Sequence, residues 1–212
     1  DQMIPEELPV ALHGAPAPIS AAERATRLDA LRKLADEAGH AAVLLGSTSS
    51  LRYFTGIDWH PSERFTGAIV PVHGGVDYIC PGFERAKISG LVTVAGDVLT
   101  WEEDEDPYGL IADRLGPHGR LAVDDQVALF MFLGLRRVLP DERLADAGPL
   151  INCLRRRKSR AELALMQHAK NITLEVQRRA WSQLRPGQRA SEIAQFINAE
   201  HRALGGQGGS TF

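Results

Sequence analysis

The stretch LRRRKSRAELALM, residues 154–166, marks the point where the organisation of this 212-residue sequence changes. Ser159 followed three residues later by Glu162 is a capping box, in which the first turn of a helix is closed by two reciprocal hydrogen bonds. The apolar residues that follow recur at helical spacing and predict a helix of about 26 residues, about 39 Å long, which Pro186-Gly187 ends. A further helix is expected over residues 189–204, and no strand follows.

Upstream of this stretch the sequence alternates between strand and helix patterns. A capping serine, Ser20, and three leucines at helical spacing predict an amphipathic helix that ends at Gly39. The turn at Gly74-Gly75 predicts a hairpin between two apolar runs. Strands are expected at residues 41–45, 68–72, 76–80, 97–101 and 120–123, and helices at 107–115 and 127–139. This alternation predicts an α/β fold with a mixed sheet flanked by helices.

The same patterns divide the chain into three segments. A proline-rich arm occupies residues 1–19, an α/β domain residues 20–148, and a helical segment residues 149–212, with the boundary at Ala147-Gly148-Pro149. Two amphipathic helices cannot bury their apolar faces alone. We therefore expect the last segment to be the truncated start of a second domain.

Composition excludes several classes of function. With 24 basic against 27 acidic residues and a net charge of −3, the sequence lacks the global positive field that draws proteins to nucleic acid or anionic lipid. It holds no apolar run of the roughly 18 to 20 residues that would cross a bilayer. The two cysteines, Cys80 and Cys153, fit neither a disulfide framework nor a structural zinc site, which favours a reducing, cytoplasmic location.

Three motifs carry a resemblance to a known family. They are Leu154-Arg155 to Lys158-Ser159 with Glu162, Met166 and Ala169; Leu184 to Gly187 followed by Glu192-Ile193-Ala194; and residues 50–56, which end in Tyr53-Phe54-Thr55-Gly56. The first motif resembles the domain junction of the pita-bread metallopeptidases (prolidase, aminopeptidase P and creatinase). The second motif resembles the turn between the first two helices of their catalytic domain. The third motif resembles a strand-to-loop signature of their N-terminal domain.

The resemblance implies a creatinase-type N-terminal domain followed by the first helices of a pita-bread catalytic domain. It also implies a bacterial-type Xaa-Pro dipeptidase or aminopeptidase that hydrolyses proline-containing dipeptides or peptides with two divalent ions, manganese, cobalt or zinc. The five metal ligands of that family lie in later strands, so no residue of this chain is expected to bind the ions. This chain would then serve in homodimer formation and in covering an active site carried by the missing C-terminal half.

The resemblance also directs attention to the loop after Gly56. A loop of this domain reaches towards a partner's active site in dimeric relatives, so Trp59 and His60 are candidates for contact with a proline ring and a carboxylate. Arg64 is the third candidate for covering the substrate. The alternative is local: Trp59 packs on its own domain, His60 faces solvent, and Asp58 and Arg64 form ion pairs or turn contacts.

Other functions remain open or are disfavoured by spacing. A non-catalytic binding protein of the same fold and a creatinase-like amidinohydrolase stay as alternatives. The acidic run 102–106 lacks the glycine of a calcium loop and is expected to be solvated. The basic run 155–160 has no interleaved aromatic residues, which disfavours nucleic-acid binding. His168 and His201 lack the His-Glu-x-x-His spacing of a single-zinc peptidase.

Overall fold

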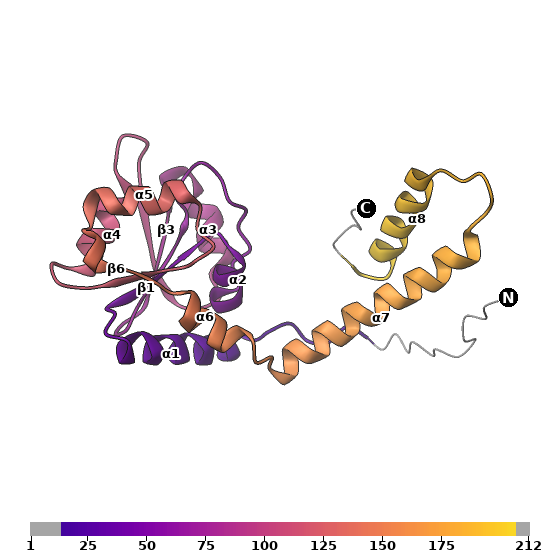
Figure 1. Ribbon diagram of the computed structural model, residues 1–212, viewed down its shortest axis with the longest axis horizontal. Helices are drawn as coiled ribbons and strands as arrows, with labels where there is room; N and C mark the ends of the chain where they lie inside the picture. Colours follow the sequence, from indigo (N-terminus) through magenta and orange to yellow (C-terminus); the bar gives the residue numbers. More distant parts are fainter. Residues whose placement is uncertain (1–13, 207–212) are drawn as a thin grey trace. The chain divides into compact units, whose positions relative to one another are not determined.

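The computed structural model describes residues 14–206, which divide into two compact units (Figure 1). Ser20–Arg157 forms the first unit; the second takes the residues from Lys158 on, together with the segment before Ser20. The predicted boundary between residues 148 and 149 falls inside the first unit. Most of the predicted arm, residues 1–13, lies outside the described residues.

The first unit is built on a mixed six-stranded sheet in the order β4-β3-β2-β1-β5-β6. Strand β2 runs antiparallel to both β1 and β3, whereas the pairs β3–β4, β1–β5 and β5–β6 are parallel. Gly74, with a φ of 101°, occupies the turn of the predicted β2–β3 hairpin, which is confirmed. The strands are β1 Ala42–Gly46, β2 Gly67–Pro71, β3 Val76–Pro81, β4 Gly96–Trp101, β5 Leu121–Val123 and β6 Leu144–Asp146.

Helices cover both faces of the sheet, so strand β1 is buried throughout. Alternate residues of β1 point to opposite faces: Val43 and Leu45 join one core cluster, Ala42 and Leu44 the other. The first cluster packs against α1, α2, α3 and α6, and the second against α4 and α5. The helices are α1 Ala21–Glu37, α2 Ser49–Thr55, α3 Arg85–Leu91, α4 Pro107–Leu115, α5 Leu129–Val138 and α6 Gly148–Arg155.

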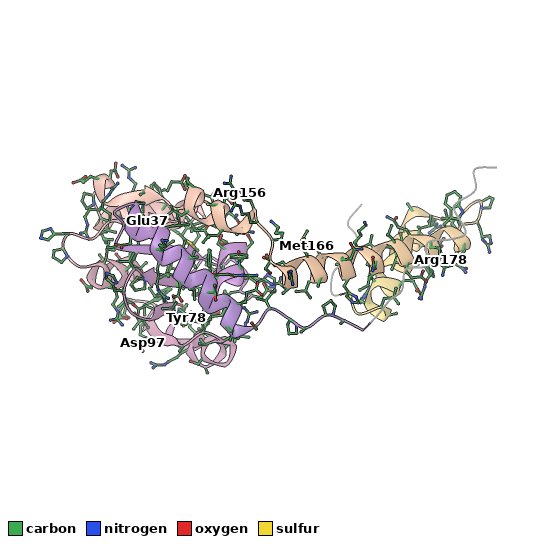
Figure 2. All side chains as sticks on the ribbon, turned by 90° about the horizontal axis from the view of Figure 1, so that it is seen from below. Glu37, Tyr78, Asp97, Arg156, Met166 and Arg178 are labelled. Carbon is green, nitrogen blue, oxygen red and sulfur yellow. The ribbon has the colours of Figure 1, made fainter. Side chains whose placement is uncertain are left out.

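The second unit contains two helices, α7 Arg160–Gln183 and α8 Ala190–Ala203. The predicted capping box is present: the Ser159 side chain accepts from the Glu162 amide at 3.1 Å, and the Glu162 carboxylate accepts from the Ser159 amide at 2.9 Å. Arg179 of α7 donates to Glu200 of α8 at 2.6 Å. Of α7 only three residues are buried and of α8 none, while Met166 is 54% exposed (Figure 2).

Three elements differ from the sequence-based expectation. Residues 50–56, expected as a strand-to-loop segment, lie on helix α2 and its C-terminal cap, and helix α3 and strand β6 were not predicted. The β-branched and aromatic residues Tyr53-Phe54-Thr55 favour a strand, but Thr48 caps the segment as a helix by accepting from the Ser50 amide at 3.1 Å. Strand β6 spans three residues, too few to show a period.

The remaining predicted elements are present within one to three residues at each end, and the mixed α/β sheet is confirmed. Among the described residues, no helix combines the length and apolar character needed to span a bilayer.

Candidate functional site

One end of the sheet gathers the loops that carry the polar side chains. Because β2 alone runs in the opposite direction, its amino end meets the carboxyl ends of the other strands. The segments 47–48, 102–106 and 124–128 follow β1, β4 and β5 at this edge, and the segment 56–66 enters β2 there. Ligand sites of α/β folds occur preferentially at the carboxyl edge of the strands.

Gly56 fixes the start of the loop that carries the predicted residues. It ends α2 in the left-handed conformation, with a φ of 82°. The Arg24 guanidinium lies against its Cα, in the space that a Cβ would take. Arg24 also donates to Thr93 at 3.1 Å, and Thr93 donates to the Thr55 carbonyl at 2.7 Å. The start of the loop is therefore fixed by contacts with α1, α2 and the segment after α3.

Trp59 and His60 are neighbours with opposite environments. Trp59 is 9% exposed and belongs to the core cluster on the α1 face, and the Lys87 ammonium lies 4.1 Å from its ring centroid. His60 is exposed. The structure thus shows a tryptophan packed on its own domain beside a solvent-facing imidazole. Their contact with a substrate stays a prediction.

Arg64 is held by carboxylates of its own domain. Its Nε donates to Glu103 at 2.7 Å, its Nη1 pairs with Glu63, and its guanidinium lies 5.6 Å from the exposed Phe83 ring. The hydrogen bond to Glu103 raises the pKa of Arg64. Asp58 also pairs with Arg52, at 3.3 Å. The predicted local ion pairs of Asp58 and Arg64 are therefore both present. A role for Arg64 over a substrate stays a prediction.

A buried carboxylate that the sequence analysis did not single out organises the same edge. Asp124, 1% exposed, accepts hydrogen bonds from the Thr48 hydroxyl at 2.5 Å, the Ser50 hydroxyl at 3.3 Å and the Gln126 amide at 3.2 Å. Burial raises the pKa of Asp124, and these hydrogen bonds oppose the rise. Arg155 of α6 approaches the Ser50 hydroxyl at 3.4 Å. Asp124 therefore ties α2 to strand β5, and its position directly after a buried strand was the available signal.

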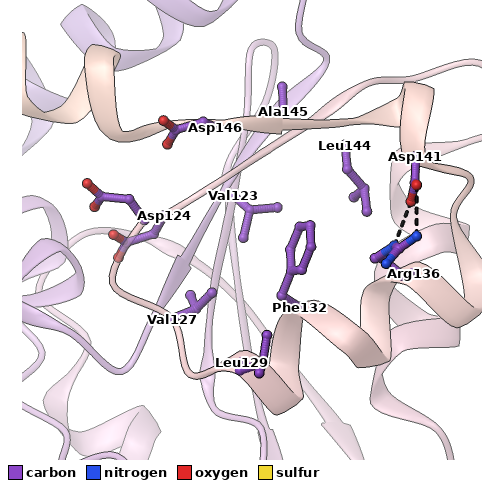
Figure 3. Close-up of a pocket in the computed structure, with 11 residues that line it drawn as sticks. Val123, Asp124, Val127, Leu129, Phe132, Arg136, Asp141, Leu144, Ala145 and Asp146 are labelled. Carbon is purple, nitrogen blue, oxygen red and sulfur yellow. Dashed lines mark hydrogen bonds and ion pairs between the residues drawn. The ribbon is translucent and has the colours of Figure 1, made fainter.

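Beside Asp124 lies a cavity of about 660 Å³ between α5 and the strands β5 and β6 (Figure 3). Its walls are mainly apolar, and aspartates lie at one end and the Arg136–Asp141 ion pair at the other. It is lined by Val123, Asp124, Asp125, Val127, Leu129, Phe132, Arg136, Asp141, Leu144, Ala145 and Asp146.

The sequence of this domain identifies its family. Residues 27–157 match the Creatinase/Prolidase N-terminal domain. The chain belongs to the creatinase/prolidase N-terminal domain family. The match spans the six-stranded sheet and most of the helices that cover it, and it ends where the first compact unit ends. The family and the α/β fold implied by the sequence motifs are thereby confirmed.

Named relatives of this creatinase/prolidase-type chain are peptidases. It is 32% identical over 194 residues to an uncharacterized peptidase of Schizosaccharomyces pombe, covering 85% of this chain and 40% of that protein. It is 29% identical over 177 residues to the probable dipeptidase PepE of Mycobacterium tuberculosis, covering 77% of this chain and 45% of that protein. The chain thus spans less than half the length of these two relatives.

Solved structures show the same fold. The dipeptidase PepE of Mycobacterium ulcerans superposes with a TM-score of 0.77 at 26% identity, over 89% of this chain and 52% of that one. A prolidase of Thermococcus sibiricus also gives 0.77, at 21% identity, over 92% of this chain and 53% of that one. The creatinase/prolidase N-terminal domain and the helices after it correspond to about half of each.

The part of the chain that the structure describes offers no metal centre. Residues 14–206 contain no group of three or more His, Cys, Asp or Glu side chains placed to hold an ion. The acidic run 102–106 is exposed, as expected, and Asp106 caps α4 by accepting from the Tyr108 amide at 3.0 Å. His201 bonds the Ile197 carbonyl at 2.9 Å within α8. The described residues therefore do not fit the pair of ions that the family resemblance implies.

Proposed function

We propose that this chain is the amino-terminal part of a metal-dependent Xaa-Pro dipeptidase or aminopeptidase. Support comes from the family match over residues 27–157, from relatives named as a peptidase and a probable dipeptidase, and from the share of those two relatives that the chain spans, 40% and 45%. A Lactobacillus helveticus protein named Xaa-Pro dipeptidase is also 27% identical over 150 residues. The family match is the observation that carries the proposal.

In this proposal the Ser20–Arg157 domain forms homodimer contacts and covers an active site. Helices α7 and α8 begin the catalytic domain, whose later segments supply the ligands for two divalent ions, manganese, cobalt or zinc. Bound there, such ions would polarise the scissile carbonyl as Lewis acids. The two free cysteines, one of them exposed, fit the proposed reducing, cytoplasmic location.

The residues of this chain would bind and orient the substrate. His60 is exposed, and a ring N–H of its imidazole can donate a hydrogen bond to a peptide carboxylate, whereas Arg52 and Arg64 are each held by a carboxylate of their own domain. Trp59 holds the loop on the domain core through its buried ring. Arg64 fixes the far side of the loop through Glu103. The loop is thereby held in one conformation, which lowers the entropy cost of binding.

Proline release from Xaa-Pro dipeptides tests the proposal. We expect the full-length protein, supplied with manganese, to release proline and to lose this activity after chelation. Full-length protein that releases none with any of the three metals, or that instead hydrolyses creatine, would contradict it. The first result favours a binding protein of the same fold and the second an amidinohydrolase.

Substitution of His60 tests the role of the loop. His60→Ala should lower kcat/KM for an Xaa-Pro dipeptide about tenfold, the effect of losing one hydrogen bond to a charged group. His73→Ala is the matched control, because His73 is exposed in the β2–β3 turn at the opposite edge of the sheet. Equal activity of both variants would remove His60 from the substrate site and leave the peptidase assignment intact.

A further inference from the structure

The cavity between α5 and strands β5 and β6 is a second candidate binding site on the first unit. Its volume of about 660 Å³ lies within the roughly 300 to 1,000 Å³ typical of ligand pockets. Phe132 and Leu144 form part of its apolar wall, and Leu129 at its rim is 70% exposed. None of Trp59, His60 and Arg64 lines it.

The aspartates that have no ion-pair partner among the described residues lie together at one end of the cavity. Asp124 and Asp146 lie at one end (Figure 3), Asp125 lies with Asp146 beside Gly148, and none of the three forms an ion pair within the described residues. The carboxylates of Asp125 and Asp146 converge on Gly148: an added Cβ there would lie 2.7 Å from Asp125 Oδ2 and 2.9 Å from Asp146 Oδ1.

The cation in the lining is already neutralised. Arg136 forms a bidentate salt bridge with Asp141, in which Nε donates to Oδ1 at 2.6 Å and Nη2 donates to Oδ2 at 2.8 Å. The lining therefore carries an excess of negative charge beside an apolar wall. An occupant with a free carboxylate would be repelled, whereas a cation would be attracted.

We infer that this cavity binds an amphipathic organic cation, a primary ammonium on a compact apolar body without a free carboxylate. The ammonium lies between Asp125 and Asp146, and the apolar body lies on Phe132 and Leu144. This inference goes beyond the proposed peptidase function and does not depend on it, because it concerns only residues of the first unit.

Leucinamide is the probe, and N-acetylleucinamide is its uncharged counterpart with the same apolar body. At pH 6.5 the amine of leucinamide is protonated. Titrated into the isotope-labelled 212-residue chain, leucinamide should shift the amide resonances of residues 125–132 and 144–148. N-acetylleucinamide should bind at least about tenfold more weakly, and added salt should weaken leucinamide binding.

Four variants separate charge from shape. Asp125→Asn and Asp146→Asn should each weaken leucinamide binding up to about fivefold, the upper end for an exposed ion pair. Gly148→Ala keeps both charges but displaces both carboxylates and should weaken binding similarly. Asp104→Asn removes one exposed charge from the 102–106 loop, outside the cavity lining, and should leave binding unchanged.

Four results would overturn the inference. In the first three, leucinamide shifts no resonance of the cavity, N-acetylleucinamide binds equally well, or Asp104→Asn weakens binding as much as Asp125→Asn does. In the fourth, the cavity resonances shift on dilution of the chain without any probe, which assigns the cavity to contact with a second copy.

Discussion

Asp124 is the residue on which the local structure of the sheet edge depends most. Its carboxylate is the shared acceptor for Thr48, Ser50 and the Gln126 amide, and it is almost fully buried. Asp124→Ala should lower the free energy of unfolding by about 2–3 kcal/mol, because it leaves these donors without their acceptor. Urea unfolding of the variant and the wild type gives the difference. An unchanged midpoint would contradict the role assigned to Asp124.

Asp124→Asn separates the charge from the hydrogen bonds, since the amide keeps one acceptor oxygen and the shape of the side chain. Burial raises the pKa of Asp124 above its ordinary value of 3.8, so in the window above pH 3.8 the folded protein retains a proton that the unfolded chain has lost. The contribution of Asp124 to stability therefore falls as pH rises through that window. The wild type should lose stability relative to Asp124→Asn between pH 4 and pH 6.

His40 gives the opposite dependence on pH. Burial, and then the charge of Arg120, lower its pKa below 6.5, and its Nδ1 is buried without a hydrogen-bond partner in the described residues. The unfolded chain therefore binds the proton first as pH falls below 6.5, and stability is lost in that direction. His40→Gln should flatten the decrease in stability between pH 7.5 and pH 5.5, measured by urea unfolding. The exposed His73, replaced in the same way, should leave the wild-type slope unchanged.

At the scale of single residues, the sequence predicted contacts within one loop better than contacts between residues that are far apart in the chain. The local ion pairs of Asp58 and Arg64 were weighed from loop composition alone, and both are present. The pairing of Asp124 with Thr48 joins residues 76 positions apart in the chain. A pattern within a short window carries no information on such a contact, because the sheet order, not the local sequence, brings β1 beside β5.

At the scale of elements, the packing of α4 on α5 depends on a glycine. A Cβ on Gly134 of α5 would overlap the Tyr108 ring of α4, at 2.7 Å from Cδ2 and closer still to two other ring atoms. Gly134→Ala gains about 1 kcal/mol in helix propensity but overpacks a rigid ring, at a cost of about 1–3 kcal/mol. We expect a net loss of stability, read from thermal unfolding.

Gly109 of α4 is the matched control for that substitution. A Cβ there meets nothing within 4 Å, so Gly109→Ala should raise stability by about 0.5–1 kcal/mol through helix propensity alone. If both variants gain stability equally, the Tyr108 ring moves aside and α4 does not depend on Gly134.

Elements with a strong local signal were the ones that the sequence predicted. Helix α7 has a capping box and helix α4 has Asp106 followed by Pro107, and both are present. Helix α2 and strand β6 have seven and three residues, too few for a hydrophobic period to show. Their form depends on remote partners: Asp124 fixes the Thr48 cap of α2, and β5 pairs with β6.

At the scale of the whole molecule, apolar burial is distributed very unevenly between the two units. Both core clusters are composed of residues between Leu28 and Leu154, so the apolar cores on both faces of the sheet belong to the first unit. In the second unit, α7 buries Ile172, Val176 and Ala180, whereas Trp181 is 62% exposed. Since apolar burial is the main favourable term in folding, nearly all of the stability should reside in the first unit.

The fragment Ser20–Arg157 should therefore fold by itself and unfold cooperatively. Because α6 packs on α1 through Ile151 in the same core cluster, a shorter fragment that ends at residue 148 should lose several kcal/mol and unfold at a lower temperature. Circular dichroism during heating compares both fragments with the 212-residue chain. We expect Ser20–Arg157 to melt within a few degrees of the main transition of the chain. A non-cooperative transition in this fragment would show that the helices beyond Arg157 contribute to the stability of the sheet domain.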